Sequence, residues 1–190
     1  SPLPENETTH AAHLPDPAIL HSPDRSTWAY LRAAHFTSRP GHADQLHLDL
    51  WWKGENIALD PGTYRYNAPA PWDNALSRSC VHNTLTVNGL EQMHRAGRFL
   101  YLEWAQAQIV TRDERSITAR HNGYRKLGII HQRTITLSDG TEWIIEDVLL
   151  STRNERSAEI VVGLNWLLVN SKQYSILGDQ HSAAIEIVTE

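Results

Sequence analysis

Hydrophobic and polar residues alternate along several stretches of the chain, as they do in strands with one buried face. The clearest stretch places Leu46, Leu48 and Leu50 on one face and His47 and Asp49 on the other. A turn at residues 53–56 follows, and residues 57–59 return in a second short apolar run. This stretch therefore predicts a β-hairpin with one side packed into a core.

Similar patterns predict strands at residues 28–34, 84–87, 99–111, 115–121, 127–137, 142–150, 158–169 and 183–188. Turn signals separate several of them, and Asn88-Gly89 is the strongest because both residues tolerate the left-handed backbone of a tight hairpin. Few segments have the period of a long amphipathic helix. Many strands with regular turns predict an all-β fold, an antiparallel β-sandwich.

The first 24 residues differ from the rest because they are rich in proline and poor in apolar side chains. We interpret residues 1–24 as a linker or extended lead-in, with residues 1–20 loosely held, and residues 25–190 as the β-sandwich domain. A chain of 190 residues is long enough for one such domain with a sizeable core.

Charge and aromatic content narrow the classes of function. The net charge of −5 argues against nonspecific binding of polyanions by the whole surface and favours neither nucleic acid nor membrane as a partner. A local basic groove remains compatible with it, since five arginines lie near residues 39–98: Arg39, Arg65, Arg78, Arg95 and Arg98. Each of the seven tryptophans has two interpretations, sugar stacking if exposed and core packing if buried.

Cys80 is the one cysteine, so no intrachain disulfide forms and cysteine usage does not indicate a compartment. If the surrounding residues were a strand, Cys80 and His82 would share a face. A thiolate ligand is one interpretation, and a small buried thiol is the preferred one.

Three potential metal ligands, His42, Asp60 and His82, stand beside apolar runs. Imidazole and carboxylate form the mixed set that zinc accepts. A simple hairpin centred near residues 54–55 would place Asp60 opposite Asp49 rather than near His42. The spacing alone does not establish this ligand set, which requires a bend near residues 40–41.

The motifs in this region resemble the heparinase II/III-like family of polysaccharide lyases. They are Gly41-His42-Ala43-Asp44-Gln45-Leu46, Asp60-Pro61-Gly62-Thr63-Tyr64 and His82-Asn83-Thr84, in the family's order and with its spacing of 18 from His42 to Asp60. The resemblance covers about residues 28–150 and is densest between residues 39 and 84.

The resemblance implies that this chain is the C-terminal β-domain, a super-sandwich-like fold, without the helical toroid that normally precedes it. It implies that His42, Asp60 and His82 hold a zinc ion that orders the cleft. The parent protein would cleave a uronic-acid polymer, glycosaminoglycan or alginate-like, by β-elimination in the periplasm or outside the cell. The family's catalytic Tyr, Asn and His would lie upstream, so the helical domain and an acidic polysaccharide are the implied partners.

One position departs from the family pattern. Where the family tends to have a catalytic-site His two residues before the first zinc ligand, this chain has Pro40. Arg39 is the alternative source of positive charge for a substrate carboxylate, besides a structural role. Tyr64, Tyr66 and Trp72, in a predicted loop at residues 61–79, are further candidates for substrate binding. We expect the isolated chain to be inactive.

Two other classes of function remain open. His42-Ala43-Asp44 with a distal His82 or His121 is the pattern of a 2-His-1-carboxylate iron oxygenase. A non-catalytic carbohydrate-binding or scaffold β-domain is the third interpretation. For His121 and His131 the preferred interpretation is a core histidine with its hydrogen bonds satisfied.

Overall fold

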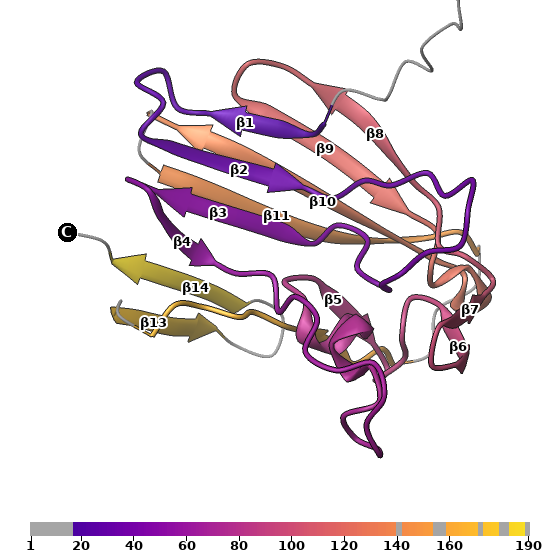
Figure 1. Ribbon diagram of the computed structural model, residues 1–190. Helices are drawn as coiled ribbons and strands as arrows, with labels where there is room; N and C mark the ends of the chain where they lie inside the picture. Colours follow the sequence, from indigo (N-terminus) through magenta and orange to yellow (C-terminus); the bar gives the residue numbers. More distant parts are fainter. Residues whose placement is uncertain (1–16, 140–141, 154–158, 171–172, 179–182, 189–190) are drawn as a thin grey trace, which may run out of the picture.

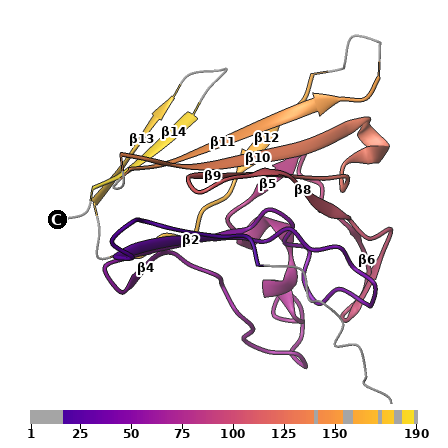
Figure 2. The ribbon, with the colours of Figure 1, turned by 90° about the horizontal axis from the view of Figure 1, so that it is seen from above.

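Two four-stranded antiparallel sheets pack face to face in the computed structural model, which describes residues 17–139, 142–153, 159–170, 173–178 and 183–188 (Figure 2). The first sheet has the order β1 (Ile19–His21), β2 (Thr27–Leu31), β3 (Leu48–Trp52) and β4 (Glu55–Ala58). The second has the order β11 (Glu142–Ser151), β10 (Ile129–Ser138), β9 (Ser116–His121) and β8 (Ala107–Arg112). The predicted antiparallel β-sandwich is confirmed.

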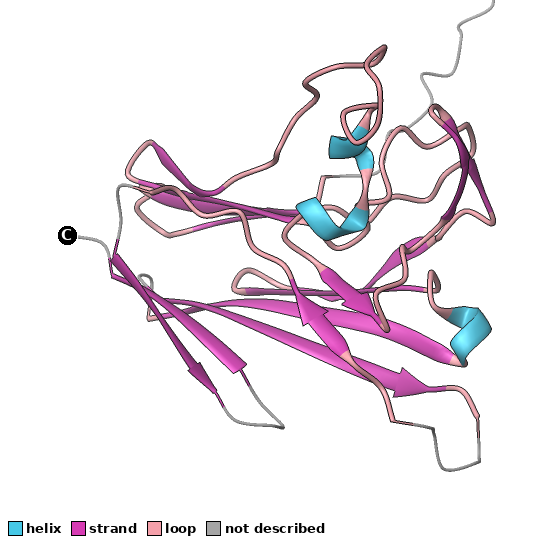
Figure 3. Cartoon of the chain, turned by 90° about the horizontal axis from the view of Figure 1, so that it is seen from below, coloured by secondary structure: helices cyan, strands magenta, loops and turns pink. Residues whose placement is uncertain are grey.

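Smaller elements surround the two sheets (Figure 1). Three further antiparallel pairs are β5 (Leu85–Val87) with β12 (Val162–Leu164), β6 (His94–Gly97) with β7 (Leu100–Leu102), and β13 (Gln173–Gly178) with β14 (Ala183–Val188). The helical content of the described residues is three short 3₁₀ turns, η1 (Ala75–Ser77), η2 (Ser79–Val81) and η3 (Arg125–Leu127) (Figure 3). Within the described ranges, no helix is long and apolar enough to span a bilayer.

The core lies between the two sheets and follows the alternation of the sequence. Ala29 and Leu31 of β2 and Leu48 of β3 are fully buried against Ile117 and Ile135 of the second sheet. Burying a Leu or Ile side chain contributes about 1.5–3 kcal/mol. The intervening residues of β2 and β3 lie on the outer face of the first sheet, where Trp28 and Trp51 stack with ring centroids 5.3 Å apart.

Two predicted boundaries need correction. The stretch interpreted as a lead-in, residues 1–24, contains β1, which pairs with β2 through Leu20↔Ala29, so the sheet begins before residue 25. Residues 1–16 lie outside the described part. The strand predicted at residues 158–169 is reduced, among the described residues, to β12.

Two tight turns have a clear local cause. Asn88 and Gly89 both have positive φ, 52° and 67°, and the N–H of Leu90 donates to Val87 O at 2.9 Å, which confirms the predicted tight turn. Between β3 and β4 the turn is Lys53-Gly54, since Trp52 pairs with Glu55, and a bulge shifts the register so that Leu50 pairs with Ala58. The predicted hairpin centre near residues 54–55, and with it the pairing of Asp60 with Asp49, is wrong.

Candidate metal centre

His42, Asp44 and His82 come together at one end of the first sheet, with one potential ligand atom from each within 4.8 Å of the others. His42 and Asp44 precede β3, whereas His82 follows η2. His42 Nδ1 and His82 Nε2 are 3.2 Å apart. The His82 side chain is fully buried, and that of His42 is 23% exposed, so solvent reaches the cluster from the His42 side.

Asp60 approaches His82 and His47 from the segment after β4, which leaves the sandwich and projects below it (Figure 1). Asp60 Oδ2 is 3.7 Å from His82 Nε2 and 3.5 Å from His47 Nε2. Its other oxygen accepts the N–H of Gly62 at 2.6 Å. Because Gly62 has φ 64°, a conformation that glycine adopts without strain, this turn aims one carboxylate oxygen at the histidines.

The hydrogen bonds of His82 determine its tautomer. Its Nδ1 lies 2.7 Å from Arg78 O, and a carbonyl only accepts, so Nδ1 carries the proton. Burial lowers the pKa of His82, which favours the neutral ring. The unprotonated Nε2 therefore accepts the hydrogen bond of His42 Nδ1 at 3.2 Å and faces Asp60. A ring whose Nδ1–H is held by a backbone carbonyl while its Nε2 carries no proton is the usual state of a metal-bound histidine.

His47 has the opposite tautomer. Its Nδ1 accepts the N–H of Asn83 at 3.0 Å, so the proton of the neutral ring is on Nε2. That buried nitrogen makes no hydrogen bond, but it faces Asp60 Oδ2 at 3.5 Å and Asp49 Oδ2 at 3.8 Å. His47 is thus suited to orient Asp60 rather than to bind a cation. Sequence reasoning missed this role, although the position of His47 opposite the leucine face was visible.

The two carboxylates near His42 differ in their surroundings. Asp44 is buried, with Oδ1 2.7 Å from Arg32 Nε and Oδ2 4.0 Å from His42 Nδ1. The guanidinium already balances the charge of Asp44. Asp60 has a 38% exposed side chain and faces two imidazoles. Asp60 is therefore the carboxylate with the smaller cost of turning toward a cation.

Two of the donor separations suit zinc, whereas Asp60 is not among the residues whose donor atoms all lie within 4.8 Å of one another, which are His42, Asp44 and His82. Ligand atoms bound tetrahedrally at 2.0–2.2 Å from zinc lie about 3.3 Å from one another. The separations of 3.2 Å between His42 and His82 and 3.7 Å between His82 and Asp60 are near that value. Two imidazoles and one carboxylate also match the chemistry of a zinc site with an open position.

The predicted substrate-binding residues lie at the surface. Tyr64, Tyr66 and Trp72 are 65%, 54% and 57% exposed on the segment between β4 and η1. The Tyr64 and Trp72 rings meet edge to face with centroids 6.3 Å apart. Arg65 lies 5.0 Å over the Tyr64 ring, which adds a cation to this aromatic surface. Arg39 is exposed on the segment before His42.

Two other sequence predictions are resolved by the structure. Cys80 is exposed and lies in η2, not in a strand, so the buried thiol and the face shared with His82 are both wrong. His121 and His131 are buried and hydrogen-bonded to each other at 3.0 Å, which confirms the interpretation as satisfied core histidines. His121 is therefore engaged away from His42, and of the two distal ligands considered for an iron site only His82 lies beside Asp44.

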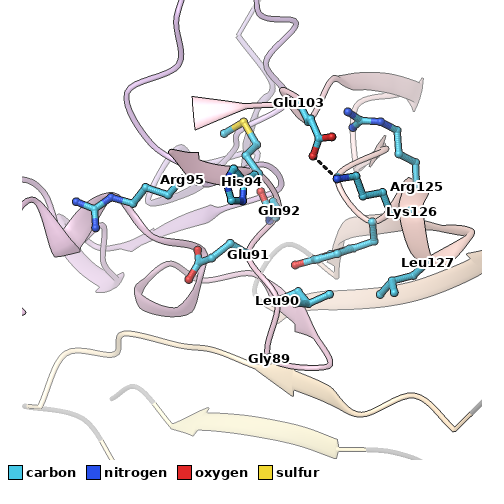
Figure 4. Close-up of a pocket in the computed structure, with 13 residues that line it drawn as sticks. Gly89, Leu90, Glu91, Gln92, His94, Arg95, Glu103, Arg125, Lys126 and Leu127 are labelled. Carbon is cyan, nitrogen blue, oxygen red and sulfur yellow. Dashed lines mark ion pairs between the residues drawn. The ribbon is translucent and has the colours of Figure 1, made fainter. Parts of the chain in front are cut away.

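A separate pocket of about 320 Å³ lies between the β5–β6 connection and η3 (Figure 4). Lys126 pairs there with Glu103 at 2.6 Å, and Arg125 lies beside them. The lining residues do not include His42, Asp60 or His82. The pocket is thus distinct from the candidate metal centre.

The fold and this cluster define a β-sandwich domain with a candidate metal centre at one end. The chain belongs to the family described as heparinase II/III-like, C-terminal, whose model matches residues 14–189. Comparison with curated proteins finds no match.

Solved structures show the same fold. A heparinase III superposes with a TM-score of 0.61 at 17% identity over 86% of this chain and 24% of its own. Heparan sulfate lyase HepC from Pedobacter heparinus superposes with a TM-score of 0.59 at 17% identity over 79% of this chain and 22% of its own. This chain therefore spans about a quarter of the length of these structures.

Proposed function

We propose that this chain is the β-domain of a lyase that cleaves an acidic, uronic-acid-containing polysaccharide by β-elimination, with zinc held by His42, Asp60 and His82. The supporting observation is the unprotonated Nε2 of His82, which faces a second imidazole at 3.2 Å and a carboxylate at 3.7 Å. Membership of the heparinase II/III-like family supports the reaction class. The neighbours with the same fold are a heparinase and a heparan sulfate lyase.

In such an elimination a base removes the proton next to the uronate carboxylate, and the glycosidic oxygen leaves from the adjacent carbon. The substrate carboxylate must be neutralised for that proton to become acidic. Exposed Arg39 is the proposed source of positive charge, and Tyr64, Tyr66 and Trp72 are proposed to stack against sugar rings.

The zinc ion, when bound, supplies a fixed positive charge that joins the segments carrying its three ligands. His82 would present Nε2 to it, with Nδ1–H kept on Arg78 O. His47 would donate Nε2–H to Asp60 and so keep that carboxylate oriented. We assign the base of the reaction to a helical domain of the parent protein, and we expect the isolated chain to be inactive. The parent protein would act in the periplasm or outside the cell.

A second candidate is a 2-His-1-carboxylate iron centre built from His42, Asp44 and His82. It is favoured by one observation, the close approach of these three residues within 4.8 Å. The charge pair between Asp44 and Arg32 argues against it, since a metal cation would compete with the guanidinium for the same carboxylate.

Metal analysis of untagged protein with Asp60→Ala and Asp44→Ala variants distinguishes the candidates. The zinc proposal requires Asp60→Ala to lose zinc and Asp44→Ala to keep most of it. The reverse result, with iron bound by the parent protein, would support the oxygenase. If the unaltered chain binds no metal in zinc-replete solution, a carbohydrate-binding or scaffold domain is the remaining interpretation. Turnover of acidic polysaccharides by the isolated chain would contradict its expected inactivity.

A further inference from the structure

Arg133, in the middle of β10, is the largest fully buried side chain among the described residues. Its Nε and Nη2 donate to the two oxygens of Asp147 at 2.8 and 2.7 Å. Burying such a pair is expensive and is weak evidence for a stabilising role, because well-packed apolar residues often serve stability as well. What distinguishes Arg133 is which atoms accept the hydrogen bonds of its remaining N–H groups.

Arg133 Nη1 donates to two backbone carbonyls that belong to the segments of the candidate centre. The first is Leu46 O, at 2.8 Å. Leu46 is fully buried and has φ 58°, a left-handed conformation that is unfavourable for a branched residue. This residue directs the chain from Asp44 into His47, so the bond from Arg133 holds a strained bend next to the centre.

The second carbonyl is Asn83 O, at 2.6 Å. Asn83 follows His82, and its backbone N–H donates to His47 Nδ1 at 3.0 Å. Its side-chain amide donates to Leu48 O at 2.8 Å and to Leu59 O at 3.0 Å. Asn83 therefore connects the segments that carry His82, His47 and Asp60. It follows His82, it binds His47, and it binds Leu59, the residue before Asp60.

We propose that Arg133, held in orientation by Asp147, is a positioning residue for the centre formed by His42, Asp60 and His82, an inference that rests on the proposed metal function. Arg133 touches no donor atom of the centre. It fixes Leu46 and Asn83, and through them the His47 and His82 rings, so that the donor atoms are arranged before a cation arrives.

Asp147 is itself fixed by a third hydrogen bond, since His131 Nε2 lies 2.7 Å from its Oδ1. Lysine cannot replace Arg133 in this arrangement. An ammonium is a single nitrogen on a flexible stem, whereas the planar guanidinium reaches one carboxylate and two carbonyls at once. Arg133→Lys keeps the positive charge but removes the planar arrangement of hydrogen-bond donors.

The test compares Arg133→Lys with Ile135→Val, a core substitution two residues along β10 with the same inward orientation. Zinc affinity is measured by competition with a chelator, and stability by thermal unfolding without metal. We expect Arg133→Lys to weaken zinc binding by about 10- to 100-fold, as loss of a supporting contact around a metal site typically does. Ile135→Val should lower the unfolding temperature and leave zinc affinity within about twofold, because this apolar side chain donates no hydrogen bond to Leu46 or Asn83.

A second measurement needs no metal. Long-range ¹H–¹⁵N NMR spectra should show the Nδ1–H tautomer for His82 and the Nε2–H tautomer for His47 in the parent chain, and mixed tautomers in Arg133→Lys. Retention of both the zinc affinity and the tautomers in that variant would overturn the inference. If Arg133→Lys does not fold, Asp147→Asn takes its place with the same criteria. A parent chain that binds no zinc would refute the proposed function, while the tautomers would still decide whether Arg133 positions the rings.

Discussion

Two clusters of histidine and aspartate occur in this sandwich, and they differ in whether their polar atoms are satisfied. In the buried cluster the N–H of Gly123 donates to His121 Nδ1, His121 Nε2 to His131 Nδ1, and His131 Nε2 to Asp147. Each of the four ring nitrogens has a partner, and the proton of each neutral ring lies on its Nε2. No lone pair remains on either ring for a metal ion.

The open cluster is built from the same residue types with a different result. His82 Nε2 has only the partly exposed His42 as its hydrogen-bond partner and faces Asp60, and the buried Nε2 of His47 lacks a hydrogen bond. Asp60 is partly exposed, whereas Asp147 is only 15% exposed. The comparison shows that residue composition does not distinguish a candidate metal site from a structural network. The unsatisfied buried nitrogen of His47 and the access of solvent do.

The largest effect should separate the two aspartates. Asp147→Ala leaves the Arg133 charge buried without its partner, so we expect a loss of about 3–5 kcal/mol in the free energy of unfolding. Asp60→Ala, without metal, should change it by less than about 1 kcal/mol because its ion pairs are partly exposed. Urea denaturation at pH 7 in the presence of a chelator measures both. Equal losses would show that the two clusters do not differ as described.

An intermediate effect should appear in the pH dependence of stability. Burial lowers the pKa of His121 well below its ordinary value, and burial also lowers the pKa of His131. In this range the unfolded chain binds more protons than the folded chain, so stability is full above about pH 6.5 and falls as the pH decreases below it.

His121→Gln should flatten this dependence between about pH 6.5 and 4.5, since it removes one of the titrating rings. Urea denaturation in that range, with a chelator present, is the measurement. Below this pH range, protonation of Asp147 causes a second loss of stability. Burial alone would raise the pKa of the Asp147 carboxyl, but Arg133 and His131 outweigh burial and hold that pKa below its ordinary range. A parent chain whose stability does not change from pH 7 to 4.5 would contradict the neutral, buried histidine pair.

The smallest effect on stability is expected at the exposed segment between β4 and η1. Trp72→Ala should change the free energy of unfolding by about 0.5 kcal/mol or less, because the side chain is 57% exposed. The same variant should bind acidic polysaccharides more weakly, since stacking on an exposed indole would be lost. Affinity electrophoresis in gels containing the polysaccharide measures this, with Leu90→Ala, 49% exposed on the β5–β6 turn, as the control. If the gel retards the Trp72→Ala and Leu90→Ala variants equally, Trp72 does not contribute to binding the polysaccharide.

The sequence by itself determined the fold class and the Asn88-Gly89 turn. The alternation of Leu48 and Leu50 with Asp49 and the Asn88-Gly89 dipeptide are local signals, because strand faces and left-handed turns depend on neighbouring residues. The sequence also selected His42 and His82, which the structure places 3.2 Å apart although 40 residues separate them.

Only the tertiary structure decided how these residues face one another. The turn at Lys53-Gly54 took Asp60 out of register with Asp49, and the left-handed Leu46 lies directly before His47, whose Nε2 is 3.5 Å from Asp60 Oδ2. Tautomers depend on partners from distant segments, such as Asn83 for His47. Arg133 looked like any residue of an alternating strand, yet it bonds residues 50 and 87 positions away. Contacts of this kind arise from the packing of one sheet on the other, which no local pattern records.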